Sequence, residues 1–466
     1  MAAAEPGPPA AQAERQVEKA AGGNMRRTEH YGKYQIMAGL IAAAVLTGCA
    51  GTGGTVSETP AGAETTAQAA TMAAEPSSET VTEKTVTEKE EAEAPVPARA
   101  DTAAEAVAAA DPAPEEGTAE ESKSPEEIAA ERAAAVGAVR LGDTGEDGLV
   151  FTFAGDLTFH TGQNPGAQEA YDSGIRSCFD QEALDIMDSA DVFVVNNEFQ
   201  YTDGGSPLEG KKYTFRCSPY TAEWLQEIGV DLVTLANNHI FDFGEEGFLD
   251  TLDTLSEIGM PYIGAGYDLE DAVRPAYYEA DGMIIAVLNA TEIERYENPD
   301  TRGASEDAGG VFRCLDSALL CEKVREAKEK ADYVIVTIHW GTERMETPDE
   351  LQIQHAIDLE EAGCDMIIGG HPHVLQTISW YEDMPIVYSL GNYFFSFDTR
   401  NTGVVQVSFD TGNKSLKSLR FVPMVQSYGL YTLEGEEKAG LLEYMRSLSP
   451  KVEIDDDGYV TKRDTE

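Results

Sequence analysis

From Leu149 onward, short apolar runs alternate with amphipathic stretches, and few folds accommodate this alternation. The runs are rich in β-branched and large apolar residues, as buried strands are, and they occupy residues 149–154, 192–195, 232–236, 283–288, 333–338, 366–368 and 386–389. Several are separated by apolar residues at helical spacing, at 221–228, 247–258, 315–330 and 349–362. Two later runs, 404–409 and 416–425, have no helix between them, which predicts an antiparallel pair. The sequence therefore predicts one layered α/β domain of about 300 residues.

The stretch before this domain has a different composition. Residues 50–147 contain no Phe, Tyr or Trp and are dominated by Ala, Glu, Thr and Pro. Such a segment cannot bury enough apolar surface to offset the entropy of ordering it, so we expect a disordered acidic tether. One short helix is predicted within it, where Ser124 can cap the first turn and Glu127 can close a capping box.

The N-terminus has the pattern of an export signal. A basic segment at residues 25–27 precedes an apolar run, residues 36–46, that falls short of the roughly 20 residues needed to span a bilayer. The run ends in Leu46-Thr47-Gly48-Cys49, which resembles a bacterial lipobox. We therefore expect Cys49 to be lipidated and the protein to act outside the cytoplasm, at the outer face of the cytoplasmic membrane. An ordinary secretory signal or a short anchor is the alternative.

These features divide the chain into five expected parts. They are a non-native start extension at 1–24, a signal peptide at 25–48, the lipidated Cys and tether at 49–147, the α/β domain at 148–430, and a C-terminal helix and acidic tail at 431–466.

The charge of the chain excludes some partners. The formal net charge is −51, and residues 148–466 alone carry 58 acidic against 22 basic side chains. Nucleic acids and anionic lipid headgroups are recognised by clustered Lys and Arg, so neither nucleic-acid binding nor electrostatic membrane docking is expected.

The cysteines do not form a framework. Apart from Cys49 there are five, without a CxxC pair. We expect them to be small buried hydrophobic residues, with a single disulfide as the alternative, and we expect no zinc site built from thiolates.

Polar residues follow almost every predicted strand. Open α/β sheets bind ligands beyond the C-terminal ends of their strands. Three of the seven histidines lie at such positions and a fourth lies just beyond one. The residues concerned are Asp156, Asn196, Glu198, Asn238, His239, His339, His371, His373 and Asn392. Each one alone is as easily explained as a hydrogen-bonded structural group, but together they predict a metal site.

The residue types indicate which metals this site would bind. Imidazole, carboxylate and amide oxygen suit Mn, Fe or Zn. In an extended backbone the side chains of His371 and His373 would point the same way. Glu198 could bridge two ions about 3.5–4 Å apart, an arrangement suited to phosphoryl chemistry. Glycines before Asp156 and His371 allow close approach of the backbone. We therefore expect two divalent ions.

Six motifs occur in a fixed order. They are Phe153-Ala154-Gly155-Asp156, Asn196-x-Glu198, Asn237-Asn238-His239 with Asp242 and Gly244, His339-Trp340-Gly341-x-Glu343, Gly370-His371-Pro372-His373 with Gln376, and Ser389-Leu390-Gly391-Asn392. From about residue 148 to 425 the sequence resembles the CapA family of bacterial capsule synthesis or poly-γ-glutamate biosynthesis proteins. The resemblance implies a calcineurin-like metallophosphoesterase fold, a layered α/β/β/α sandwich. It also implies a role in making, exporting or anchoring a γ-linked glutamate polymer beside membrane-bound synthetase subunits.

The same resemblance implies individual roles. Asp156 and His373 would bind one metal, His339 and His371 the other, with Glu198 between them. Asn238 would be a further ligand and His239 a candidate general acid, and the site would also be lined by Asn196, Asp242, Glu343, Gln376 and Asn392.

The sequence departs from the metallophosphoesterase pattern at two positions. The first motif of that fold is usually Asp-x-His, whereas here His160 lies four residues after Asp156. The bridging position is Glu198 and not an aspartate.

Two functions remain open. The protein is an accessory factor that binds or guides poly-γ-glutamate, or it is a metal-dependent phosphoesterase or hydrolase acting on an envelope polymer. A small basic group, Lys211, Lys212 and Arg216, could contact a carboxylate polymer or be ordinary solvated surface. His355 is expected at the surface or in a groove, and Trp340 and Tyr393 either line the cleft or pack in the core.

Overall fold

The computed structural model describes residues 123–142, 144–145, 147–294, 301–395 and 398–463. They belong to one of the two units into which the chain divides, Pro112–Glu466. The predicted start extension, the signal peptide, Cys49 and most of the tether lie outside the described residues.

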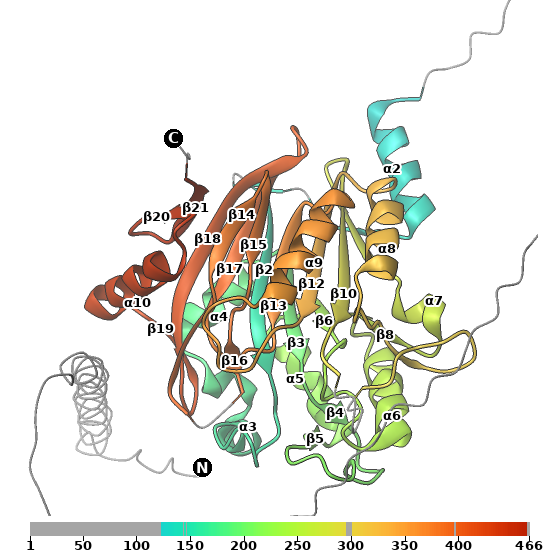
Figure 1. Ribbon diagram of the computed structural model, residues 1–466, viewed down its shortest axis with the longest axis vertical. Helices are drawn as coiled ribbons and strands as arrows, with labels where there is room; N and C mark the ends of the chain where they lie inside the picture. Colours follow the sequence, from blue (N-terminus) through green and yellow to red (C-terminus); the bar gives the residue numbers. More distant parts are fainter. Residues whose placement is uncertain (1–122, 143, 146, 295–300, 396–397, 464–466) are drawn as a thin grey trace, which may run out of the picture. The chain divides into compact units, whose positions relative to one another are not determined.

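A ten-stranded sheet forms one half of the domain (Figure 1). Its parallel part consists of β2 (Leu149–Leu157), β3 (Val192–Asn197), β6 (Leu232–Thr234), β7 (Tyr262–Ile263) and, on β2, β16 (Asn392–Phe394). Its antiparallel part consists of β17 (Arg400–Asp410), β18 (Ser415–Gln426), β19 (Leu430–Thr432), β20 (Val452–Ile454) and β21 (Tyr459–Lys462). The antiparallel pair expected from the two late apolar runs is thus confirmed as β17 and β18.

A seven-stranded sheet forms the other half. Four parallel strands lie in its centre, β10 (Met283–Thr291), β12 (Tyr333–His339), β13 (Met366–Gly370) and β15 (Met384–Val387). The edges are completed by β1 (Val139–Arg140), β9 (Ala276–Ala280) and β14 (Ile378–Tyr381). Two small ribbons lie apart, β4 (Gln200–Tyr201) with β5 (Arg216–Cys217), and β8 (Ala265–Gly266) with β11 (Gly310–Val311).

Helices cover the outer faces of both sheets. The ten-stranded sheet packs against α4 (Gln181–Asp188), α5 (Glu223–Glu227) and α6 (Gly244–Glu257). The seven-stranded sheet packs against α8 (Ala318–Lys328) and α9 (Glu350–Glu361). Further helices are α2 (Pro125–Val136), α3 (Ala167–Ser173), η1 (Ile175–Cys178), η2 (Pro219–Ala222), α7 (Leu269–Ala272) and α10 (Gly435–Leu448). The predicted layered α/β/β/α sandwich is confirmed.

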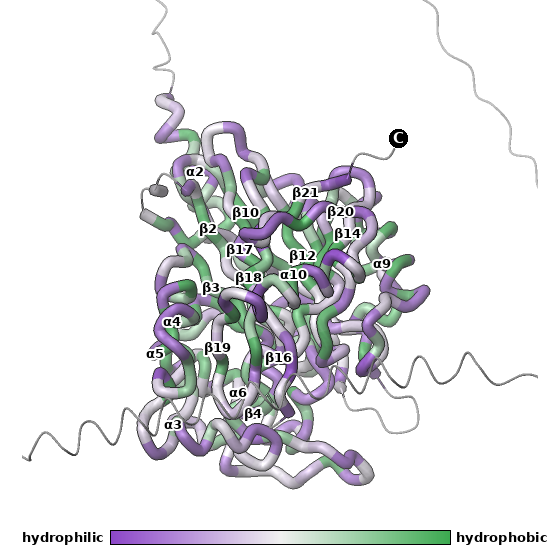
Figure 2. Tube along the Cα trace, turned by 90° about the vertical axis from the view of Figure 1, so that its left-hand side faces the viewer, coloured by the Kyte–Doolittle hydropathy of each residue, from purple (hydrophilic) through white to green (hydrophobic). Residues whose placement is uncertain are grey.

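The strand β2 shows why the apolar runs are nearly continuous. Phe151 and Phe153 point into the core between the two sheets, whereas Ala154 and Leu157 contribute to the core under the helices. A strand with both faces buried cannot alternate apolar with polar residues. Hydrophobic residues accordingly recur along the central strands in Figure 2.

The predicted end of the tether at residue 147 is wrong. The expected helix is present as α2 (Pro125–Val136), and Ser124 and Glu127 form the predicted capping box. The helix, however, is joined to the domain, because Arg132 pairs with Asp332 at 3.0 Å and β1 extends the seven-stranded sheet beside β9. Six of the nine apolar residues at 124–140 are alanines, which bury little surface, so the segment depends on these contacts to join the domain.

The predicted acidic tail at 431–466 is also wrong in part. The helix is present as α10, but the chain then returns as β20 and β21, and β21 pairs with β18. Val452, Ile454 and Val460 are buried in this hairpin, so the alternation of apolar residues there outweighs its acidic composition.

The described residues include five of the six cysteines. All five cysteines within them are buried and free, as expected of small hydrophobic residues. No helix in this part of the chain has the length and apolar content needed to cross a membrane.

Candidate metal centre

Donor side chains from both sheets meet at the C-terminal ends of the parallel strands. In the ten-stranded sheet, Asp156 ends β2 and Glu198 follows β3; in the seven-stranded sheet, His339 ends β12 and His371 follows β13. Gly370 at the end of β13 lets the two sheets approach, because a Cβ at this position would lie 2.9 Å from Asp156 Oδ1. The strand-end position of the site follows the general rule for α/β sheets.

The donors form two groups that share Glu198. In the first group, His339 Nε2 lies 3.7 Å from Glu198 Oε1 and 3.1 Å from His371 Nδ1. Asn238 Oδ1 lies 2.9 Å from the same nitrogen of His339. In the second group, His373 Nδ1 lies 3.0 Å from Asp156 Oδ2, and His373 Nε2 lies 3.8 Å from Glu198 Oε1. The structure thus brings together all six residues predicted as metal ligands.

The buried oxygen Glu198 Oε1 is central to this arrangement. It lies 3.7–3.8 Å from Nε2 of three imidazoles, those of His239, His339 and His373. Among the described residues it has no hydrogen-bond partner. A buried carboxylate oxygen without a partner carries a desolvation cost that a cation would remove. The residues present therefore fit two divalent ions with Glu198 between them.

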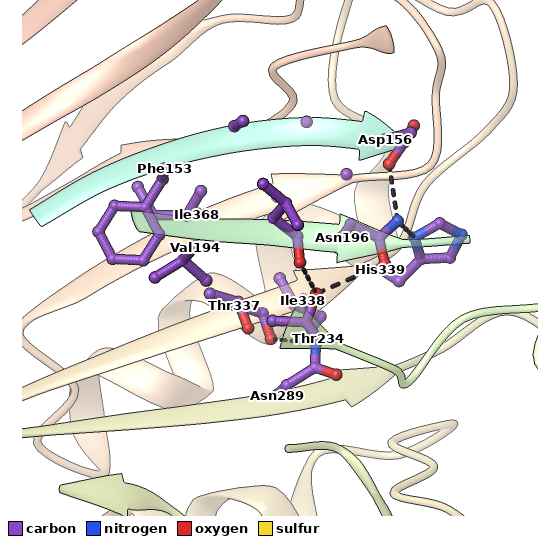
Figure 3. Close-up of a pocket in the computed structure, with 15 residues that line it drawn as sticks. Phe153, Asp156, Val194, Asn196, Thr234, Asn289, Thr337, Ile338, His339 and Ile368 are labelled. Carbon is purple, nitrogen blue, oxygen red and sulfur yellow. Dashed lines mark hydrogen bonds between the residues drawn. The ribbon is translucent and has the colours of Figure 1, made fainter. Parts of the chain in front are cut away.

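Asn196 orients the donors from behind (Figure 3). Its Nδ2 donates to Asp156 Oδ1 at 2.8 Å and lies 3.3 Å from His339 Nδ1. The same Nδ2 also donates to Glu198 Oε2 at 3.2 Å. Asn237 in turn donates to Asn196 Oδ1 at 3.0 Å. Partners of this kind fix ligand orientation in metal sites.

A cavity of about 30 Å³ lies behind the donors, between the two sheets (Figure 3). Asp156, Asn196 and His339 close one end, and the walls are mostly apolar residues such as Phe153 and Val194. Its volume corresponds to one or two water molecules, and its lining omits Glu198, so it is an interior gap and not the substrate cleft. The site opens at His373, where 18% of the side chain is exposed.

His239 is held so that one nitrogen faces the centre. Because a carboxylate only accepts, Nδ1 of His239 donates to Asp242 Oδ2, at 2.8 Å. The ring stacks on Phe215, with centroids 4.3 Å apart, and Nε2 points towards Glu198. This orientation allows proton exchange at Nε2.

Burial sets the protonation states of the donors. It lowers the pKa of His339 to about 3 and lowers the pKa of His371 well below its usual value. Burial raises the pKa of Glu198 well above its usual range, and neighbouring Asp156 raises it further. For Asp156, burial alone would raise the pKa, but the hydrogen bond and charge of His373 bring it below the usual value. Neutral imidazoles are the form that binds metals.

The expectation that His371 and His373 lie in extended backbone is wrong. Their φ angles are 94° and 57°, in the left-handed region that side chains other than glycine rarely adopt. The chain leaves β13 at Gly370 and turns sharply, and Pro372 between them accepts a hydrogen bond from the backbone N–H of Arg344. Both imidazoles reach the centre through this turn, at a conformational cost of about 1–3 kcal/mol each.

Two residues expected to line the site are not members of the donor groups. Glu343 is exposed, although its charge is among those that raise the pKa of Glu198. Gln376 is buried, donates to the carbonyl of Met345 and accepts from Gln352, so it fastens the loop after β12 to α9. By contrast, Asn392 is buried in β16, directly beside Asp156.

Other histidines and aromatic residues are structural. His355 is buried, and its Nδ1 lies 3.2 Å from Glu292 Oε2, which corrects the expected position at the surface or in a groove. Its helical spacing alone did not show which face of α9 packs against the sheet. His160 does not join the donors, because its Nδ1 lies 2.9 Å from the carbonyl oxygen of Arg216. Trp340 and Tyr393 are fully buried and belong to the core.

Lys211 is the residue whose position the sequence did not indicate. Its side chain is buried, and its Nζ lies 2.6 Å from Oδ1 of Asp242, the partner of His239. Its neighbour Lys212 is exposed over the ring of Tyr213, and Arg216 stacks on Phe243. The sequence predicted only a small basic group in an acidic chain. No rule of residue spacing predicts which of the two adjacent lysines has a buried side chain.

The fold and the donors define a layered α/β protein with a carboxylate and histidine centre at its strand ends. The family described as "Bacterial capsule synthesis protein PGA_cap" matches residues 150–396, which is more than half of the chain. The chain belongs to this family.

Several relatives share part of the sequence. The "PGA biosynthesis protein CapA" of Bacillus subtilis is 36% identical over 186 residues, which cover 39% of this chain and 48% of the relative. The "Capsule biosynthesis protein CapA" of Bacillus anthracis is 31% identical, over 48% of this chain and 53% of the relative. A "Probable polyglutamine synthesis accessory protein" of Mycobacterium tuberculosis is 30% identical, over 45% and 58%. The chain thus spans about half the length of the curated relatives it matches.

Solved structures show a looser similarity. A phosphatase from Mycoplasma pneumoniae has 14% identity and a TM-score of 0.37, covering 60% of this chain and 94% of its own. A 5'-nucleotidase from Candida albicans has 13% identity and a TM-score of 0.34, covering 69% and 55%. The family assignment rests on the sequence match and not on these structures.

Proposed function

We propose that the protein is an accessory factor in the biosynthesis, export or anchoring of poly-γ-glutamate or a similar anionic envelope polymer. The match to the capsule synthesis family over residues 150–396 carries this proposal. The names of the Bacillus relatives point to the same process. The partners would be the polymer itself and membrane-bound subunits of its synthetase.

The proposal includes a place of action. The lipobox-like sequence before Cys49 supports a lipoprotein that is anchored at the outer face of the cytoplasmic membrane. A lipid anchor would keep the protein where a growing polymer leaves the membrane. A single acyl chain gives marginal binding, so more than one chain is needed for stable anchoring.

The metal centre would let an acidic protein meet an anionic polymer. With a net charge of −51, the chain repels polyglutamate unless cations lie between them. Two divalent ions, of Mn, Fe or Zn, would be held by Asp156 and His373 and by His339 and His371, with Glu198 shared. The opening at His373 then gives carboxylate groups access to the cations.

Binding of γ-linked glutamate oligomers to the full-length protein tests the proposal. We expect binding with Mn²⁺ or Zn²⁺ that disappears on chelation and in the His371→Ala/His373→Ala variant. Absence of binding in the presence of either metal would contradict it.

The second candidate is a metal-dependent phosphoesterase or hydrolase of an envelope polymer. It is favoured by the position of His239, whose Nε2 faces Glu198 while Asp242 holds Nδ1. Bound divalent ions would supply Lewis acidity to a phosphoryl or carboxyl group. In the neutral ring the proton lies on Nδ1, so Nε2 accepts a proton first and donates it afterwards to a leaving group.

A panel of phosphoesters and cell-wall fragments tests this candidate. Replacement of His239 by alanine should reduce a metal-stimulated rate by about 100-fold or more. If no substrate shows a rate that depends on both metal and His239, the accessory role stands alone.

A further inference from the structure

Lys211 is buried beside the metal centre, although it lies in the connection between β4 and β5, residues 202–215. Only 4% of its side chain is exposed. Its Nζ lies 2.6 Å from Asp242 Oδ1 and also donates to the backbone carbonyl of Asn238. A lysine is rarely buried to this extent unless it is paired. The Asp242 carboxylate and the Asn238 carbonyl stabilise the buried ammonium group.

Asp242 joins this connection to the segment that carries two site residues. Its Oδ2 accepts from the N–H of Phe215 at 2.6 Å as well as from His239 Nδ1 at 2.8 Å. Its backbone carbonyl accepts from the N–H of Leu208 at 2.8 Å. The connection is therefore joined to residues 238–242 at Leu208, Lys211 and Phe215, and Lys211 contributes a cation to these contacts.

We propose that Lys211 is a positioning residue of the metal centre. Through the Asn238 carbonyl and the Asp242 carboxylate, its ammonium group fixes the turn that directs Asn238 Oδ1 towards His339 Nε2 and His239 Nε2 towards Glu198. The inference rests on the metal centre of the proposed function, and it adds a residue from a connection that supplies no ligand itself.

The charge of Lys211 and its positioning contacts would have opposite effects on the affinity of the centre for a cation. Burial lowers the pKa of His371, and the charges of nearby groups, Lys211 among them, lower it further, so this ammonium group lies within electrostatic reach of the donors. If Lys211 acted through charge alone, its removal would strengthen the binding of a cation. If it positions Asn238 and His239, its removal weakens that binding. The sign of the change therefore distinguishes the two roles.

The test compares metal binding by full-length variants in which one lysine is changed. Lys211→Met removes the ammonium group but retains much of the side-chain volume, and Lys212→Met changes the exposed neighbour as a matched control. Dissociation constants for Mn²⁺ and Zn²⁺ are measured by titration calorimetry on metal-free protein, and circular dichroism reports the fold.

We expect Lys211→Met to weaken metal binding about 10- to 100-fold, as removal of supporting partners does in other metal sites. Lys212→Met should bind as the wild type does, and Lys211→Arg, which retains the charge and donors, should restore part of the loss. A purely structural role would lower the thermal midpoint of the metal-free protein and leave the dissociation constants unchanged.

Equal or tighter metal binding by Lys211→Met would overturn the inference. If that variant does not fold, Lys211→Gln, which retains a donor for the Asn238 carbonyl, is measured with the same two outcomes. Failure of the wild type to bind either metal would instead overturn the proposed metal centre itself, so the two failures are distinct.

Discussion

Glu198 Oε1 lies 3.7 Å from His339 Nε2, although the two residues leave different sheets. Glu198 follows β3 in the ten-stranded sheet and His339 ends β12 in the seven-stranded sheet. The donor set is complete only when the two sheets are packed together. We therefore expect metal binding to be thermodynamically coupled to the packing of the two sheets.

Metal removal should lower the stability of the folded protein. A ligand that binds only the native state stabilises it by about 2.7 kcal/mol when its free concentration is 100 times the dissociation constant. We expect the thermal midpoint to rise with Mn²⁺ or Zn²⁺ and to fall after chelation. Glu198→Gln is the control and should show no metal-dependent shift. An identical midpoint for the wild type with and without metal would count against the coupling.

Metal binding should depend on pH through Glu198. Burial raises the pKa of Glu198 well above its usual range, so the metal-free carboxyl retains a proton at pH values where an ordinary glutamate has lost it. The metal needs the carboxylate, so affinity falls as the pH falls and binding releases a proton. His339, with a pKa of about 3, is already neutral and releases none at pH 5–8.

Calorimetry in two buffers of different ionisation enthalpy measures this proton release. We expect a positive release at pH 6 that decreases as the pH rises. An affinity that is independent of pH, with no proton released, would contradict the expectation.

The segment with α2 and β1 should contribute to stability. A chain that begins at residue 148 loses the Arg132–Asp332 pair and the pairing of β1 with β9. We expect its thermal midpoint to fall by about 2–4 °C for each kcal/mol lost. A chain that begins at residue 113 keeps both elements and is the control. Equal midpoints for the two chains would show that the segment adds no stability.

Asp332 gives the same segment a dependence on acid. Burial alone would raise the pKa of Asp332, but the hydrogen bonds from Arg132, the Ile284 N–H and Lys414 lower it below the usual value. Its contribution is complete above the pKa of an unfolded aspartate, about 3.9, and is lost as the pH falls through the lower folded value. The protection of α2 amides against hydrogen exchange, relative to an unfolded chain at the same pH, should therefore fall below pH 4 in the wild type. Asp332→Asn should show the lower protection at neutral pH as well.

How much the sequence predicted depends on the kind of interaction. Buried strands such as β2 and β12 were predictable, because burial of both faces requires apolar residues at every position. The positions of the candidate donors Asp156 and His339 were predictable as well, because strand ends place polar residues at one edge. The turn at His371 was not, since its positive φ accompanies contacts with the distant loop after β12, which contains Arg344. The burial of Lys211 was not either, because its partner Asp242 lies 31 residues further along the chain.

 At the turn that contains His371, the backbone N–H of Arg344 donates to the carbonyl of Pro372. No local sequence pattern relates these two residues, so the contact could not be predicted.

The metal content of the purified full-length protein tests the central claim most directly. Elemental mass spectrometry of the wild type should find about two transition-metal ions per chain, as expected of a centre in which one carboxylate bridges two ions. The His371→Ala/His373→Ala variant, which removes one imidazole from each donor group, should lose them while it keeps its fold. Wild-type protein that folds and yet holds no stoichiometric metal, even after incubation with Mn²⁺ or Zn²⁺, would contradict the claim that these strand ends form a metal centre.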